Sequence, residues 1–125
     1  ATLILQSPFS SAREMSRRLG VPWVVAFWRL ISRVHFDPIA CVRSVAAPVW
    51  VAHGDSDSVI PVSMGREVFS AARVPGELLI VSGAGHNNLE EMGGRAYWRW
   101  LTNAVRGQTS EQTSLGARAE RRSAP

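Results

Sequence analysis

Residues 53–61 read His-Gly-Asp-Ser-Asp-Ser-Val-Ile-Pro, and residues 83–87 read Gly-Ala-Gly-His-Asn. Each stretch follows a short apolar run, at residues 49–52 in the first case and at residues 78–81 in the second. Wholly apolar runs that end in turn residues are typical of strands buried on both faces of a sheet. The two stretches are therefore predicted to be loops at the ends of buried strands.

The pattern around these loops predicts an α/β fold. Residues 2–5 form a third apolar run, and the segments 12–19, 37–44 and 63–73 have the capping residues or the apolar spacing of helices. No hairpin signal joins the three strands, so they are predicted to pair in parallel through right-handed crossovers. Three strands make a poor domain by themselves. Because the chain also begins with Ala1 rather than Met, we expect an incomplete sheet cut from a longer sequence.

Cap and turn residues predict the ends of several elements. Asp37-Pro38 has the pattern of an N-cap followed by proline at the first helical position, which opens a helix to about Ser44. Pro75-Gly76 is predicted to be a turn. The last helix is predicted to begin at Gly94 or Arg95 and to end at Val105.

Two further segments complete the predicted organisation. Residues 21–34 carry a broad apolar face, interpreted as a core or cap helix, with a lid over an acyl or aromatic pocket as the alternative. Residues 107–125 are mostly Gln, Thr, Ser, Gly, Ala and Arg, a composition that cannot offset the entropy of ordering. Residues 1–106 are thus predicted to be part of a folded domain, and residues 107–125 a disordered tail.

Composition narrows the classes of partner. The formal net charge is +4, and all 14 basic residues are arginine, several of them in or beside the tail. Nucleic acid is therefore not a predicted partner. The single cysteine, Cys41, favours a reducing, cytoplasmic setting. The longest apolar run, Val21 to Leu30, is broken by Arg29 and falls short of the ~20 residues of a membrane span, so no transmembrane segment is predicted.

Asp57 and His86 are the candidate catalytic acid and base. Loops at the carboxyl ends of neighbouring parallel strands converge on one edge of a sheet, so a hydrogen bond between the two side chains is feasible. The carboxylate would accept the Nδ1 proton of His86, fix its tautomer and stabilise the imidazolium. Gly83 and Gly85 would allow the tight backbone path that carries His86 back over the site.

The neighbouring polar residues have simpler interpretations. Asp55 comes too soon after its strand and is predicted to be a turn residue. His53 and His35 are interpreted as buried histidines with satisfied hydrogen bonds. Ser56 and Ser58 stand beside acidic residues, which disfavour an alkoxide, so neither is a predicted nucleophile.

Two kinds of functional motif are absent from the sequence: a nucleophile turn and a set of metal ligands. It contains no Gly-x-Ser-x-Gly, so a nucleophile turn is missing. Ser7, Ser10 and Ser11 could touch substrate or support the acid loop, although helix capping is the simpler interpretation. The three histidines and three aspartates form no close ligand set, so neither a metal nor a cofactor is predicted.

Several motifs together resemble a known family over residues 1 to about 105. They are Leu5 to Ser11, Phe36-Asp37 with Ile39 and Val42, Ala47-Pro48-Val49, His53-Gly54 through Asp57 to Pro61, Gly65 with Phe69, Gly83 to Asn87, and Tyr97 with Leu101. On these residues the chain resembles the C-terminal half of the α/β-hydrolase superfamily. Within it, the chain is most similar to the Bem46-like branch, which includes protein depalmitoylases and many uncharacterised bacterial hydrolases.

The resemblance implies a function for a longer protein. It places the family's acid on Asp57 and its base on His86, and it places the nucleophilic serine and the oxyanion loop in a missing N-terminal half, upstream of Ala1. The implied enzyme is a serine hydrolase of carboxylic esters or thioesters, acting through an acyl-serine on a small-molecule or acylated substrate. The isolated chain is expected to be inactive.

Two other hypotheses remain open at this point. The chain could be a non-catalytic remnant or binding module of the same fold that uses the aromatic segment Trp23 to Trp28 for a partner. It could also be a regulatory fragment whose arginine-rich tail binds acidic surfaces.

Overall fold

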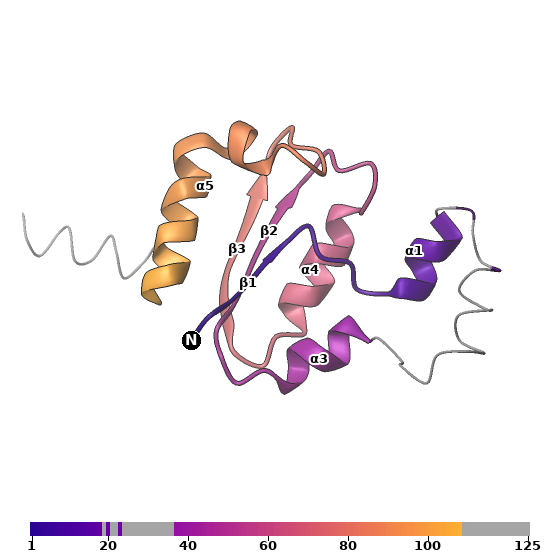
Figure 1. Cartoon of the computed structure of the whole chain (residues 1–125), viewed down its shortest axis with the longest axis horizontal. Helices are drawn as coiled ribbons and strands as arrows, with labels where there is room; N and C mark the ends of the chain where they lie inside the picture. Colours follow the sequence, from indigo (N-terminus) through magenta and orange to yellow (C-terminus); the bar gives the residue numbers. More distant parts are fainter. Residues whose placement is uncertain (19, 21–22, 24–36, 109–125) are drawn as a thin grey trace, which may run out of the picture.

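The computed structural model describes residues 1–18, 20, 23 and 37–108, and a parallel sheet runs through this part of the chain (Figure 1). Its strands are β1 (Leu3–Gln6), β2 (Val49–Gly54) and β3 (Pro75–Val81), in the order β1-β2-β3. Both pairings are parallel, so the three carboxyl ends lie at the same edge of the sheet. The predicted α/β class and parallel pairing are confirmed.

Helices cover both faces of the sheet. The described helices are α1 (Ala12–Arg18), α3 (Pro38–Ser44), α4 (Val62–Ser70) and α5 (Leu89–Arg106). Figure 1 shows α3 and α4 on one side of the sheet and α5 on the other. The helix α1 stands further out, where Met15 packs with Ile60 and Met64 in a small apolar cluster.

The middle strand, β2, is the centre of the core, because all of its residues are buried. Its side chains alternate between the two faces. Val49 and Val51 pack against α3 and α4, whereas Trp50 and Ala52 join the cluster under α5 that contains Trp100. A strand covered on both faces needs apolar residues at every position, which explains the continuous apolar run in the sequence.

The predicted start of α3 is confirmed. Pro38 is its first residue, and the Asp37 carboxylate accepts a hydrogen bond of 3.0 Å from the Ala40 amide. This bond satisfies one of the backbone N–H groups that have no partner inside the first helical turn. Ser11 acts in a similar way at α1, where its hydroxyl accepts a 3.3 Å hydrogen bond from the Glu14 amide.

The predicted turn at Pro75-Gly76 is wrong, because both residues belong to β3. Pro75 is the first residue of the strand, a position where proline is tolerated in a sheet. Gly76 lies against the indole of Trp50, and a Cβ atom there would come within 2.4 Å of the ring. The pairing of β2 with β3 is irregular between Val49 and Val51. The dipeptide therefore makes room for a buried tryptophan instead of reversing the chain.

The last helix begins earlier than predicted. The helix α5 starts at Leu89, and Gly94 interrupts it with φ 47° and ψ −129°. The predicted helix from residue 94 or 95 corresponds to the part after this kink. Gly107 ends the helix in the left-handed conformation, with φ 68°, as glycine commonly does at this position. The predicted ends of α4 (63–73) and β3 (78–81) also differ by a few residues from the observed ones, Val62–Ser70 and Pro75–Val81.

Two predictions fall largely outside the described residues. The proposed helix or lid at 21–34 is described only at Trp23, whose side chain is 71% exposed. Of the predicted tail, only Gly107 and Gln108 are described, and both are exposed. Within the described part of the chain, no helix has the length and apolar character needed to cross a bilayer.

Candidate active site

Asp57 lies in the loop that follows β2, with its side chain fully buried. Its Oδ1 atom accepts hydrogen bonds from the backbone amides of Val59, at 2.9 Å, and Ile60, at 2.8 Å. A short acidic side chain that bonds the amides two and three residues ahead closes a tight turn. The turn fixes the orientation of the carboxylate and leaves its other oxygen, Oδ2, free to face a neighbouring loop.

His86 comes from the loop that follows β3, and its Nδ1 atom lies 2.9 Å from Oδ2 of Asp57. The structure thus brings together the two residues that the sequence singles out. A carboxylate only accepts hydrogen bonds, so Nδ1 carries the proton and donates it. The neutral imidazole then has its lone pair on Nε2, and the side chain is 32% exposed at the rim of a cavity.

The loops after β2 and β3 are held together by backbone hydrogen bonds. The Ser56 amide donates to the Ala84 carbonyl at 3.0 Å, and the Asp55 amide donates to the Val81 carbonyl at 3.1 Å. This contact depends on Gly54, because a Cβ atom there would lie 2.1 Å from the Ala84 carbonyl oxygen. The geometry of the Asp57–His86 pair therefore rests on close backbone packing as well as on the two side chains.

Gly83 and Asn88 shape the loop that carries His86. Gly83 adopts φ 74°, a conformation that glycine reaches without steric cost. The Asn88 side-chain oxygen accepts a 2.7 Å hydrogen bond from the Gly85 amide. The positive φ of Gly83 agrees with the tight backbone path predicted for this loop. The hydrogen bond to Asn88 holds the loop next to His86.

His53 is fully buried beneath the acid loop, as predicted. Its Nε2 atom lies 2.9 Å from the Ile60 carbonyl oxygen and 3.5 Å from Oδ2 of Asp57. Since the carbonyl only accepts, Nε2 donates and ties the far end of the turn to β2. Within the described residues, Nδ1 has no hydrogen-bond partner, and Gly65 of α4 packs against it. The sequence predicts a buried histidine with both ring nitrogens hydrogen-bonded, but only Nε2 has a partner among the described residues.

Asp55 is a turn residue, as predicted. Its Oδ1 atom accepts a 2.7 Å hydrogen bond from the Gly83 amide and one of 3.0 Å from the Ser56 hydroxyl. These bonds, the Gly83 amide first, lower the pKa of Asp55 below its ordinary value. Ser56 and Ser58 are exposed. His35 lies outside the described residues.

The environment of Asp57 lowers the pKa of its carboxyl group. Burial by itself raises this pKa, because the charged form loses water. Four interactions lower the pKa. In order of size they are the hydrogen bonds from the Ile60 amide, from His86 and from the Val59 amide, and the electrostatic attraction of His86. Their sum outweighs burial, so the pKa lies below the usual 3.8 and the acid is ionised at neutral pH.

This lowered pKa predicts a pH-dependent contribution to stability. A carboxyl group whose pKa is lower in the folded chain stabilises it fully above the unfolded value of 3.8, and the contribution is lost as pH falls through the folded value. We expect the free energy of unfolding of wild type to exceed that of Asp57→Asn by a constant amount near neutral pH. The difference should shrink below pH 3.8 in urea titrations. A difference that stays constant down to the acid limit would contradict this.

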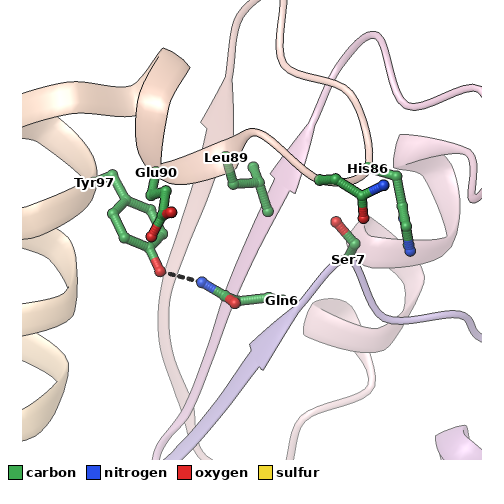
Figure 2. Close-up of a pocket in the computed structure, with 7 residues that line it drawn as sticks. Gln6, Ser7, His86, Leu89, Glu90 and Tyr97 are labelled. Carbon is green, nitrogen blue, oxygen red and sulfur yellow. Dashed lines mark hydrogen bonds between the residues drawn. The ribbon is translucent and has the colours of Figure 1, made fainter.

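A cavity of about 340 Å³ opens beside His86, between the loop after β3, the end of β1 and α5 (Figure 2). It is lined by Gln6, Ser7, His86, Asn87, Leu89, Glu90 and Tyr97. The Gln6 amide donates a hydrogen bond to the Tyr97 hydroxyl across one end of the cavity. Sequence reasoning missed the role of Gln6, Glu90 and Tyr97 here. The available signals were the position of Gln6 and Ser7 at a strand end and the place of Tyr97 among the motifs of the resembled family.

Neither a metal site nor a nucleophile turn is found in the part of the chain that the structure describes. No group of three or more His, Cys, Asp or Glu side chains within it is arranged to hold a metal ion. The described residues thus supply a buried, ionised acid, a base that it orients, and a polar cavity. In chemical terms this pair can take a proton from a hydroxyl group placed at Nε2 of His86 and return it to a leaving group.

Known proteins share this sequence over part of their length. The chain is 34% identical over 116 residues to the uncharacterized protein Rv2307c of Mycobacterium tuberculosis, which covers 93% of this chain and 39% of that protein. It is also 34% identical over 93 residues to human alpha/beta hydrolase domain-containing protein 17B, covering 74% of this chain and 30% of that protein. The chain therefore spans well under half the length of these relatives. No protein-family model matches the sequence.

A solved structure shares the fold. MGS-MChE2, an alpha/beta hydrolase enzyme from the metagenome of lagoon sediments at Mar Chica, Morocco, superposes with a TM-score of 0.52 at 13% identity. The superposition covers 82% of this chain and 48% of that one. The match to protein 17B agrees with the Bem46-like branch predicted from the motifs. By sequence and by fold, the chain belongs to the α/β-hydrolase superfamily. Its described residues form part of that fold, with three parallel strands and their flanking helices.

Proposed function

We propose that this chain is the acid- and base-bearing part of a serine hydrolase that cleaves carboxylic esters or thioesters. The observation that supports this most directly is the 2.9 Å contact between His86 Nδ1 and Asp57 Oδ2 at the carboxyl edge of a parallel sheet. A hydrogen-bonded acid and base at this edge are two of the three members of a hydrolytic triad. The nucleophilic serine would come from a segment outside these 125 residues.

The proposed reaction has two halves. In the first, Nε2 of His86 takes the serine proton while the serine oxygen bonds to the substrate carbonyl carbon, and Asp57 stabilises the resulting imidazolium. The imidazolium then gives its proton to the departing alcohol or thiol, which leaves an acyl-serine. In the second half, His86 takes a proton from water while the water oxygen bonds to the acyl carbon. The imidazolium then returns this proton to the serine oxygen as the bond between that oxygen and the acyl carbon breaks, which releases the carboxylic acid and restores the serine.

The test combines this chain with a segment that supplies the nucleophilic serine. The 125-residue chain is fused to, or co-expressed with, an N-terminal half that carries a Gly-x-Ser-x-Gly turn, and we call this combination the two-part enzyme. It should hydrolyse p-nitrophenyl butyrate. His86→Ala should lower kcat by about 10⁶-fold, because the serine loses its base.

Replacing the serine of the added turn by alanine provides the matched control, and it should cause a loss of similar size. Circular dichroism and urea unfolding check that each variant keeps its fold. If the His86→Ala variant retains full activity, His86 is not the base. If no combination hydrolyses any ester although both parts fold together, the chain is better explained as a non-catalytic remnant.

A further inference from the structure

Ser7, in the cavity beside His86, has no part in the proposed proton transfers. It is the residue directly after β1, and its amide donates a 2.9 Å hydrogen bond to the Ala52 carbonyl. Among the described residues, it is the only one other than glycine with a positive φ, at 43°. The left-handed region is uncommon for residues with a Cβ atom, so the backbone here is held in an unfavourable conformation.

The hydroxyl group of Ser7 is also unusual. The residue is only 7% exposed, and its Oγ atom has no hydrogen-bond partner among the described residues. Figure 2 shows this oxygen pointing up from the end of β1 toward the cavity, below the loop that carries His86. A buried hydroxyl without a partner destabilises a fold, and such groups are rare in native structures. Strain and an unused donor at the same residue are typical of positions kept for a ligand.

The rest of the cavity wall indicates the chemistry of that ligand. Every lining side chain except Leu89 carries a polar group: two amides, a carboxylate, an imidazole, a phenol and the Ser7 hydroxyl. An acyl chain placed here would cover these groups without forming hydrogen bonds, which is costly. An alcohol with further hydroxyl groups can both donate to them and accept from them.

We propose that this cavity binds the alcohol part of the substrate, a small alcohol that carries further hydroxyl groups, and that Ser7 holds it by a hydrogen bond. The inference rests on the proposed hydrolase function and narrows it to oxygen esters of such alcohols. His86 lines the same cavity, so the leaving alcohol would lie beside the group that protonates it. A serine hydroxyl turns between staggered rotamers and can therefore follow an oxygen of the ligand.

The test measures binding to the 125-residue chain without any turnover. Two butyrate esters, glyceryl monobutyrate and ethyl butyrate, share an acyl group and differ in the alcohol. In ¹⁵N-resolved NMR titrations, glyceryl monobutyrate should shift the amide signals of Ser7, His86 and Glu90, with Kd on the order of 1–10 mM. Ethyl butyrate should bind about tenfold more weakly or not at all. Equal binding of the two esters would overturn the proposal.

Two variants separate a binding role of Ser7 from a structural one. Ser7→Gly relieves the positive φ and Ser7→Ala keeps it, and both remove the hydroxyl. Each should weaken the binding of glyceryl monobutyrate about tenfold, while the urea midpoint stays at the wild-type value or rises, because an unpartnered buried group is removed. A lower midpoint with unchanged binding would show a structural role and overturn the proposal. So would transfer of a butyryl group to Ser7, seen as a mass increase, since Ser7 would then be the nucleophile.

The binding test uses the 125-residue chain alone, so its result can be compared with the activity of the two-part enzyme. If that enzyme hydrolyses esters but the chain does not distinguish the two alcohols, the subsite is wrong and the hydrolase function stands. If the chain distinguishes the alcohols but no two-part enzyme is active, the binding site stands and the hydrolase function is wrong.

Discussion

Asp57→Asn should lower the kcat of the two-part enzyme by about 10⁴-fold while leaving the fold intact. The size of the effect follows from the orientation that the loop imposes. The amides of Val59 and Ile60 donate to Oδ1, so an asparagine at this position would turn its carbonyl oxygen toward them. Its NH₂ group would then occupy the place of Oδ2 and face His86.

That arrangement reverses the tautomer of His86. Its Nδ1 would have to accept a hydrogen bond from the asparagine, so the imidazole proton would move to Nε2, where the base needs a lone pair. Asp55→Asn is the matched control, because it makes the same change in the same loop at a residue whose side chain accepts from Gly83 and Ser56 instead of from His86. We expect that control to stay within a few-fold of wild type.

The measurement is the hydrolysis of p-nitrophenyl butyrate at pH 7, together with the ¹⁵N signals of the His86 ring, which report the tautomer directly. Retention of more than about a tenth of the activity by Asp57→Asn would be incompatible with the proposed role of the acid. A large loss in Asp55→Asn would indicate that the loop as a whole, and not the carboxylate at position 57, carries the effect.

Gly54→Ala should destabilise the chain by about 3 kcal/mol. The new Cβ atom would lie 2.1 Å from the carbonyl oxygen of Ala84 and 2.6 Å from its carbonyl carbon, both of them backbone atoms. A flexible side chain could move aside, but this backbone is tied by the hydrogen bond from Ser56 to Ala84. The loops after β2 and β3 would therefore have to separate.

Separation of the loops should also impair catalysis. A displacement of about 1 Å at a catalytic group can cost about 10²-fold in rate, so the two-part enzyme carrying Gly54→Ala should lose at least that much activity. Gly85→Ala is the control, since the nearest atom to its added Cβ is the Asn88 oxygen at 3.6 Å. Urea unfolding of the 125-residue chain should show a change under about 1 kcal/mol for that variant. Similar losses in both variants would mean that the Gly54 contact is not the cause.

The parts of the fold that local chemistry determines were predictable. Asp37 and Pro38 start α3 because an acceptor at the N-cap and a fixed φ at the next residue act within one helical turn. The residues 49–52 form a buried strand because both faces of β2 need apolar side chains. Asp57 and His86 could be paired in advance because the carboxyl ends of neighbouring parallel strands share one edge.

Other features depend on residues that are far apart in the sequence. Pro75-Gly76 has the composition of a turn, and only the indole of Trp50 lying against Gly76 explains why the strand continues through it. The sequence predicts a helix start at Gly94 or Arg95, whereas α5 begins at Leu89, which is buried in the core cluster with Val81 and Tyr97. Local propensity is weak compared with such contacts, so these boundaries could not be read from the residues themselves.

The sequence by itself determined the α/β class, the parallel pairing of the strands and the pairing of an acid with a base, because each depends on short-range patterns and on one general rule of sheet geometry. Only the tertiary structure decided that Gln6 bonds to Tyr97, that Ser7 lies buried and unpartnered beside His86, and that Gly54 lets two loops touch. The physical reason is that hydrogen bonds and close contacts act over a few ångströms in space. Which distant residues come that close is set by the packing of the whole chain.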